Sequence, residues 1–160
     1  MKDVEMKLIS ELMKDCRRSD RELAKAIGTS QPTVSRVRLK LEKEGLIEYI
    51  AIPDVAKFGI GIVAVTFGKR NLGKFPENLQ LATDFAKEHP NVIFASDGLG
   101  FGYNRIAISI HKTYSDYAKF IQDAKDVWQN MMNIESFIID TASKGIVQRL
   151  SFKQLTKLLE

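Results

Sequence analysis

The sequence RELAKAIGTSQPTVSRVRLKLEKEG, residues 21–45, holds two short helical patterns with a single glycine between them. Ser19 is a typical residue to begin the first helix. Gly28 is typical of its end, because glycine readily adopts the positive φ that such a turn often needs. Ser30 can cap the second helix, which Gly45 ends. Two helices joined by so tight a turn predict the helix-turn-helix geometry.

Apolar positions on the two helices recur at spacings of three and four residues, so each helix has one face suited to a hydrophobic core. These inward positions are Leu23, Ala24, Ile27, Val34, Val37 and Leu41. The remaining face of the second helix is polar and has no core against which to pack. With the cap, its outward residues are Ser30, Gln31, Thr33, Ser35, Arg36, Arg38 and Lys40.

The outward residues have the chemistry that recognises the major groove of DNA. Glutamine pairs with adenine and arginine with guanine, while serine and threonine meet base edges or phosphate. Ser30 and the free N–H groups at the helix start can hold a phosphate oxygen. The N-terminal half of a recognition helix reaches base edges, so the predicted base readers are Gln31, Thr33, Ser35 and Arg36. Arg38 and Lys40 lie further along and are predicted phosphate contacts.

Positive charge is concentrated around these helices. Between Lys14 and Lys40 eight lysines and arginines stand against three acidic residues, a local net charge of +5, whereas the whole chain carries +4. Ordinary solvated helices also carry such clusters. The cluster is informative because it coincides with the outward polar face.

The predicted DNA-binding domain covers residues 1–52. It begins with a helical pattern at residues 4–14, where Val4 and Leu8 share a face. After the second helix of the pair, LIEYIAI at residues 46–52 has the β-branched and aromatic residues of a strand. That strand would supply the wing of a winged helix-turn-helix. Residues 53–61 read as a linker.

A second domain is expected at residues 62–160. The predicted order is strand, helix, strand, strand, helix, strand, which is the split βαβ of ferredoxin-like domains. The elements are a strand at 60–68, a helix at 76–89, strands at 91–97 and 105–112, a helix at 114–132, a strand at 134–147 and a short C-terminal helix from Ser151. The predicted fold class is therefore α+β, with an N-terminal winged helix-turn-helix followed by a ferredoxin-like βαββαβ domain.

The whole chain resembles the Lrp/AsnC, or feast/famine, family of archaeal and bacterial transcription regulators. The family's DNA-binding segment is similar to residues 21–54, with a Leu-Ala pair, a turn glycine, a Thr-Val-Ser-Arg run and a Leu-Glu-x-x-Gly-x-Ile ending. The resemblance implies a sequence-specific DNA-binding regulator that responds to a small-molecule effector such as an amino acid. It further implies a homodimer, or a higher homo-oligomer, that pairs through its C-terminal sheets. The two-fold symmetry of a dimer would require a near-palindromic operator on double-stranded DNA.

The family's effector loop lies between the second and third strands of the C-terminal domain and usually carries a Thr-Gly…Asp pattern. Here that loop is SDGLGFGYNR, residues 96–105. By resemblance, the effector-binding residues are Gly98, Gly100, Gly102, Tyr103 and Asn104. Asn104 stands where an aspartate is expected, and an amide can only hydrogen-bond an ammonium group that a carboxylate would hold by charge. Asp97 is then the nearest residue able to neutralise an amino-acid effector.

Two other functions stay open from the sequence. One is an enzyme of the sirohaem decarboxylase type, since those enzymes of haem synthesis resemble this family in fold. The other is an effector-sensing module that has lost DNA binding. The charged outward face of the second helix argues against both.

No catalytic set, cofactor or metal site is expected. Cys16, His89 and His111 lack the spacing of metal ligands. A single cysteine suits a reducing compartment, and the start of the chain does not have the form of a signal peptide. No apolar run approaches the roughly 20 residues that would span a bilayer. The sequence predicts a cytoplasmic protein without a membrane partner.

Overall fold

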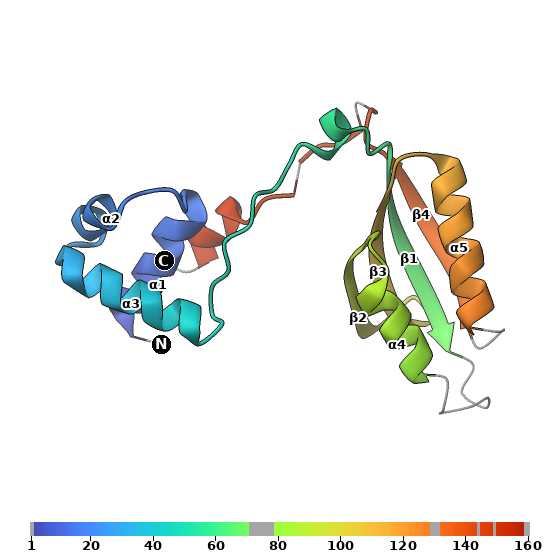
Figure 1. Cartoon of the computed structure of the whole chain (residues 1–160), viewed down its shortest axis with the longest axis horizontal. Coiled ribbons are helices and arrows are strands. Elements are labelled where there is room, and N and C mark those ends of the chain that lie inside the picture. Colours follow the sequence, from blue (N-terminus) through green and yellow to red (C-terminus); the bar gives the residue numbers. More distant parts are fainter. Residues whose placement is uncertain (1, 71–78, 129–131, 144, 149, 159–160) are drawn as a thin grey trace. The chain divides into compact units, whose positions relative to one another are not determined.

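The computed structural model describes all residues except 1, 71–78, 129–131, 144, 149 and 159–160. The chain divides into two compact units, Met1–Ile52 with Gln148–Glu160, and Pro53–Val147. The C-terminal boundary differs from the predicted one, which assigned residues 148–160 to the second domain. The predicted C-terminal helix is a 3-10 helix, η3 (Lys153–Leu158), and it packs on the first helix of the N-terminal unit (Figure 1).

The N-terminal unit contains the three predicted helices, α1 (Asp3–Lys14), α2 (Asp20–Ile27) and α3 (Gln31–Lys43). Ser19 caps α2 in a reciprocal capping box, in which the Glu22 N–H donates to Ser19 Oγ at 3.3 Å and the Ser19 N–H to Glu22 Oε2 at 2.8 Å. Gly28 ends α2 with φ +70°, the left-handed conformation that the turn requires. Ser30 caps α3.

The core of this unit consists of the apolar positions that the sequence spacing predicts. Its buried members are Leu8, Leu12, Leu23, Ala24, Val34 and Leu41. Ile27 and Val37 are partly buried and pack against them. The three helices therefore form one packed unit, in which α2 and α3 have the expected helix-turn-helix relation.

The predicted wing strand at residues 46–52 is wrong. The structure has no strand between α3 and the short 3-10 helix η1 (Val55–Phe58). A strand is stabilised by backbone hydrogen bonds to a neighbouring strand, and no described segment of this chain provides such a neighbour there. The apolar side chains of the segment are accordingly exposed, with Ile50 the most open to solvent.

The C-terminal unit is a four-stranded antiparallel sheet with two helices. In chain order its elements are β1 (Ile62–Arg70), α4 (Leu79–Glu88), β2 (Val92–Gly100), β3 (Tyr103–His111), α5 (Tyr114–Trp128) and β4 (Met132–Asp140). The strands lie in the order β2-β3-β1-β4. This confirms the predicted βαββαβ order. The outer parts of both predicted helices, at 76–78 and 129–131, lie outside the described residues.

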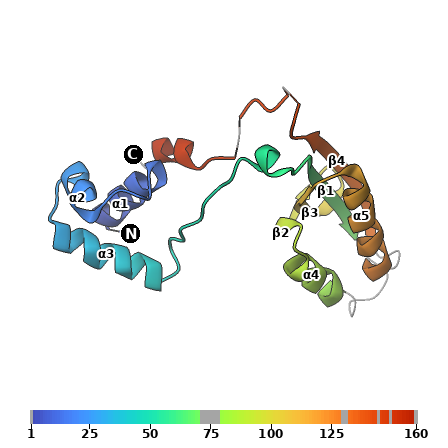
Figure 2. The same ribbon diagram turned by 45° about the horizontal axis from the view of Figure 1, so that its top comes forward.

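Both helices cover the same face of the sheet (Figures 1 and 2). Ala82 of α4 and Ala124 of α5 are buried between the helices, where their small side chains allow close packing. His111 of β3 also points to this side, because its ring contacts Tyr117 and Phe120 of α5 at centroid distances of 5.4 and 5.0 Å. His111 is thus a buried core residue, hydrogen-bonded to Ser109 Oγ at 2.9 Å.

The opposite face of the sheet is apolar, and no described residues of the C-terminal unit form a layer over it. Since Ile62 pairs with His111, the residues next along each strand point away from the helices. By this register the open face displays isoleucine, valine and phenylalanine from all four strands. Its members are Val63, Val65, Phe67, Phe94, Ile106, Ile108, Ile110, Phe137 and Ile139.

Candidate functional site

The outward face of α3 is the first part of the candidate site. Val34 and Leu41 are fully buried on the inner side of the helix. Arg36, Lys40 and Lys43 lie three and four residues apart on the opposite, exposed side. Gln31 is exposed at the start of the helix, and Thr33 is half-buried with its hydroxyl 2.9 Å from that of Ser30. The structure therefore presents Arg36 to solvent as expected, and adds Lys43, which the sequence argument did not include.

Ser35 and Arg38, by contrast, are engaged within the protein. The Ser35 hydroxyl donates to one carboxylate oxygen of Asp20 at 2.5 Å, and Arg38 Nη1 donates to the other at 2.7 Å. The Arg38 side chain is only 21% exposed, and its guanidinium lies 5.6 Å from the centre of the Tyr49 ring. The expectation that these two residues face outward is wrong. They hold the first turn of α2 to the middle of α3.

Lys40 is also paired within its unit. Its Nζ lies 2.7 Å from Glu5 Oε1 of α1, and the Glu5 side chain is 7% exposed. The hydrogen bond from Lys40, with one from the backbone N–H of Lys2, holds the pKa of Glu5 below its ordinary value. The same contact raises the pKa of Lys40. A role for Lys40 at DNA phosphate must therefore compete with a structural role on α1.

The Glu5–Lys40 pair should make the N-terminal unit sensitive to acid. Because folding lowers the pKa of Glu5, the stabilisation is complete above the ordinary value of 4.5 and is lost as the pH falls through the folded value. We expect the Tm of wild-type protein to fall more steeply than that of Glu5→Gln between about pH 5 and about pH 3. Glu48→Gln, at an exposed position, is the matched control. Parallel curves for wild type and Glu5→Gln would contradict the assignment.

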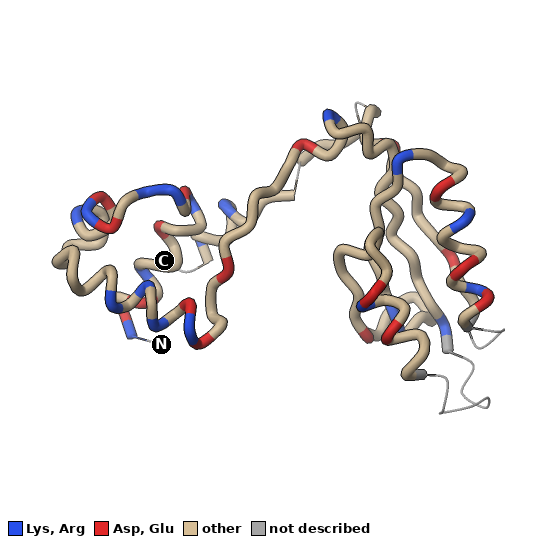
Figure 3. Tube along the Cα trace, in the orientation of Figure 1, with Lys and Arg blue, Asp and Glu red and all other residues tan. Residues whose placement is uncertain are grey.

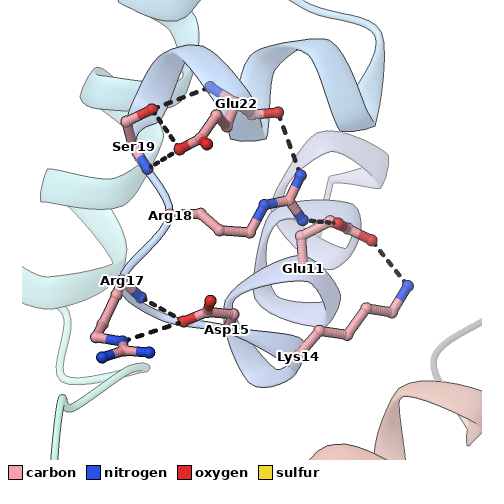
Figure 4. Close-up of polar contacts among 7 residues, drawn as sticks. All are labelled: Glu11, Lys14, Asp15, Arg17, Arg18, Ser19 and Glu22. Carbon is pink, nitrogen blue, oxygen red and sulfur yellow. Dashed lines mark hydrogen bonds and ion pairs between the residues drawn. The ribbon is translucent and has the colours of Figure 1, made fainter.

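Most of the predicted positive cluster is neutralised locally. Arg18 hydrogen-bonds Glu11 and the Glu22 carbonyl oxygen, Lys14 also bonds Glu11, and Arg17 bonds Asp15 (Figure 4). Within the described residues of α2 and α3, the cations without an ion pair are Arg21, Lys25, Arg36 and Lys43. Figure 3 shows basic residues along both helices. These unpaired cations are the ones with charge available for a polyanion.

The predicted effector loop is a tight hairpin. Only Phe101 and Gly102 lie outside the strands, and both have positive φ, 51° and 79°, as in a type I′ turn. The loop expected at residues 98–104 is therefore wrong in extent. Gly98 and Gly100 belong to β2, where the register shifts, and Tyr103 and Asn104 belong to β3.

Of the predicted effector residues, the three glycines have unoccupied space beside them. A side-chain carbon built on Gly98, Gly100 or Gly102 would meet no atom within 4 Å. Tyr103 instead packs against Phe67, with 5.7 Å between the ring centroids. A hydrogen bond with Glu135 raises the pKa of Tyr103. The hairpin therefore does not itself enclose a ligand within one chain.

A groove lies nearby, between α4 and β2. It has a volume of about 440 Å³ and is lined by residues that include Thr83, Lys87, Phe94, Asp97 and Arg105. Of these, the sequence argument named only Asp97. The signal that could have revealed Arg105 is its place in RIAISIH, where it is the single cation on the side that alternation turns toward the helices.

Comparisons with known proteins agree with this geometry. Residues 1–48 match the family model described as winged helix-turn-helix DNA-binding. An uncharacterised HTH-type transcriptional regulator of Pyrococcus furiosus, PF2053, is 30% identical over 145 residues, which cover 89% of this chain and 93% of that protein. An AsnC family transcriptional regulator from Agrobacterium tumefaciens has a crystal structure with a TM-score of 0.78 and 17% identity, covering 95% of each chain. The chain belongs to the HTH-type transcriptional regulators, and it has the fold of an AsnC family structure.

A second similar structure shows the same fold over nearly the whole length of this regulator. It is the transcriptional regulator NMB0573 from Neisseria meningitidis in complex with L-Met, with a TM-score of 0.80 and 16% identity over 99% of each chain. DNA-binding regulation is the function that the relatives support, and they do not favour the sirohaem decarboxylase alternative. Among the described residues of this regulator, no helix is long and apolar enough to cross a membrane.

Proposed function

We propose that this regulator binds its operator through α3, with Arg36 reading a base edge and Gln31 and Thr33 beside it. The observation that carries the proposal is the pattern of unpaired charge on α2 and α3. Arg36 is exposed on the side of α3 away from the core and has no ion pair among the described residues, so its guanidinium can make a bidentate contact with guanine.

Arg21 and Lys25 of α2, and Lys43 near the end of α3, are proposed phosphate contacts. They take the place of Arg38 as phosphate contacts, because Arg38 forms an ion pair with Asp20. Ser30 supports the start of α3 as its cap, so its proposed contribution to DNA is the free N–H groups of the first turn rather than its own hydroxyl. In the helix-turn-helix arrangement, cations on the first helix of the pair lie over the backbone while the second helix enters the groove.

The open apolar face of the sheet supports a homodimer. A sheet needs a covering layer on each apolar face, and an exposed apolar patch of this kind marks an interaction surface. A symmetric dimer would present two recognition helices, which matches a near-palindromic operator with half-sites about 34 Å apart or a multiple of it. The proposed location is the cytoplasm, where such an operator is accessible.

The proposed effector is a small metabolite, and the L-Met complex of the Neisseria meningitidis regulator supports an amino acid. The role of the hairpin residues from Gly98 to Asn104 in binding the effector stays a prediction from the family resemblance.

The test is a DNA-binding assay on the upstream region of the regulator's own gene and on an unrelated duplex of equal length. Arg36→Ala should weaken binding to the operator by about 1–3 kcal/mol and leave binding to the unrelated duplex nearly unchanged. Lys25→Ala should weaken both and reduce the salt dependence by about one unit.

Arg17→Ala is the control, because the Arg17 side chain is 91% exposed but lies outside both helices. Wild-type affinity for the operator in both Arg36→Ala and Lys25→Ala would remove α2 and α3 as the DNA-binding surface.

A further inference from the structure

We propose that Leu39 of α3 is a specificity-determining residue of the regulator, and that it contacts the C5-methyl group of a thymine in the major groove of the operator. This inference rests on the proposed function, because it requires that α3 enters the groove. It adds an apolar contact with one base to the polar contact of Arg36 with another.

Leu39 lies at the centre of the outward face of α3. Because an α-helix turns about 100° per residue, Leu39 is nearly opposite Val37 and Leu41, two positions before and after it. Leu41 is fully buried and Val37 packs on the same core, whereas Leu39 is 55% exposed. Arg36 precedes it by three residues and Lys43 follows it by four, so both cations share its side of the helix. An exposed leucine therefore stands between the two cations of α3 that form no ion pair among the described residues.

The charges beside Leu39 indicate what covers it. A single exposed leucine is common on protein surfaces and by itself needs no explanation. Leu39 differs because Arg36 and Lys43 on either side of it attract a polyanion. A duplex held by these two cations would remove the leucine between them from water.

The chemistry of the major groove then selects the base. Its base edges carry one apolar group, the C5-methyl of thymine, and otherwise hydrogen-bond donors and acceptors. A leucine pressed against a donor or acceptor would shield it from water without replacing the lost hydrogen bond, which costs free energy. Leu39 therefore favours thymine at one operator position and disfavours cytosine, whose edge carries an amino donor and no methyl group.

The place of Leu39 along α3 is within the reach of base readout. In homeodomains the recognition helix reads bases from positions up to about seven residues apart, and Leu39 lies seven residues after Pro32 in the first turn of α3. The three residues from Arg36 to Leu39 advance the helix by about 4.5 Å, and successive base pairs are about 3.4 Å apart. The thymine should therefore lie roughly one or two base pairs from the guanine that Arg36 reads.

The test compares thymine with deoxyuridine, which lacks only the methyl group. Operator duplexes from the upstream region of the regulator's own gene carry deoxyuridine at one thymine position at a time, in both half-sites, and fluorescence anisotropy measures the Kd of the intact protein. One such replacement should weaken wild-type binding about three- to tenfold, as expected for the loss of a buried methyl contact. Leu39→Ala should bind the thymine operator about three- to tenfold more weakly than wild type does, and it should bind the thymine and deoxyuridine operators equally.

Leu46→Ala is the matched control, because Leu46 is 53% exposed but follows the end of α3. It should keep the wild-type preference for thymine over deoxyuridine, and so should Arg36→Ala at its lower affinity. Leu39→Ala should keep the wild-type stability in chemical denaturation, because its side chain is exposed. It should also bind the unrelated duplex as wild type does, since an apolar contact does not act on phosphate.

The proposal is overturned, with α3 still the DNA-binding surface, if Leu39→Ala binds the operator as wild type does. It is also overturned if no deoxyuridine replacement weakens wild-type binding, or if the one that does weakens Leu39→Ala by the same factor. An equal loss of operator and unrelated duplex in Leu39→Ala would contradict it as well, because a base contact acts on the operator alone. A wild type that binds both duplexes equally would instead contradict the proposed function, and this inference with it.

Discussion

A chain carrying Ile108→Asp is expected to run as a monomer under conditions where the wild type runs as a dimer. Ile108 lies on the open face of the sheet, where it pairs with Val65 of β1 and Phe94 of β2. In a dimer formed through this face, each chain would bury a carboxylate in an apolar layer without a partner. The cost of several kcal/mol corresponds to a dissociation constant raised on the order of a thousandfold.

Light scattering at micromolar concentration measures this effect, with the chain mass of 18.1 kDa as the monomer reference. Leu81→Asp is the matched control, because Leu81 is an exposed leucine on α4, on the other side of the sheet. The substitution at Ile108 should preserve the circular dichroism spectrum, since the aspartate of a monomer can be solvated at this partly exposed position. A wild type with the mass of one chain, or a dimer that survives Ile108→Asp, would exclude this face as the interface.

Asp20→Ala is expected to destabilise the N-terminal unit by about 2–3 kcal/mol and to weaken binding to all DNA sequences. One carboxylate accepts from both Ser35 and Arg38, so its removal leaves two donors of α3 without their acceptor. Both Asp20 and Arg38 are 21% exposed, so water replaces the lost contact only in part. The orientation of α2 against α3 then loosens, and Arg36 loses its fixed position relative to Lys25.

Asp15→Ala provides the comparison, because Asp15 also pairs with an arginine but in an exposed position, where ion pairs contribute about 0–1 kcal/mol. Chemical denaturation measures the stability of each variant, and the DNA-binding assay separates Asp20→Ala from Arg36→Ala. Asp20→Ala should lose affinity for both the operator and the unrelated duplex, whereas Arg36→Ala should lose affinity for the operator alone. Equal stabilities of Asp20→Ala and Asp15→Ala would show that the Asp20 contacts do not hold the two helices.

The helix-turn-helix and the βαββαβ order were predictable because both depend on local signals. Ser19, Gly28 and Ser30 act on the backbone within one turn of themselves, and the spacing of Leu23, Val34 and Leu41 identifies a buried face. Arg36 was predicted to point outward for the same reason. Val34, two positions before it, and Val37, one position after it, anchor the helix to the core.

The partners of charged and polar side chains were decided by tertiary structure alone. Arg38 lies 18 residues from Asp20, and Lys40 lies 35 residues from Glu5. Helical spacing shows which side of α3 such a residue occupies, but it does not show that another helix brings a carboxylate to that side. The wing strand failed for a related reason, because LIEYIAI has strand-like residues and still needs a neighbouring strand to bond with. The groove at Arg105 was likewise decided by tertiary structure alone, because Thr83, Asp97 and Arg105 come from three elements that meet only in the folded domain.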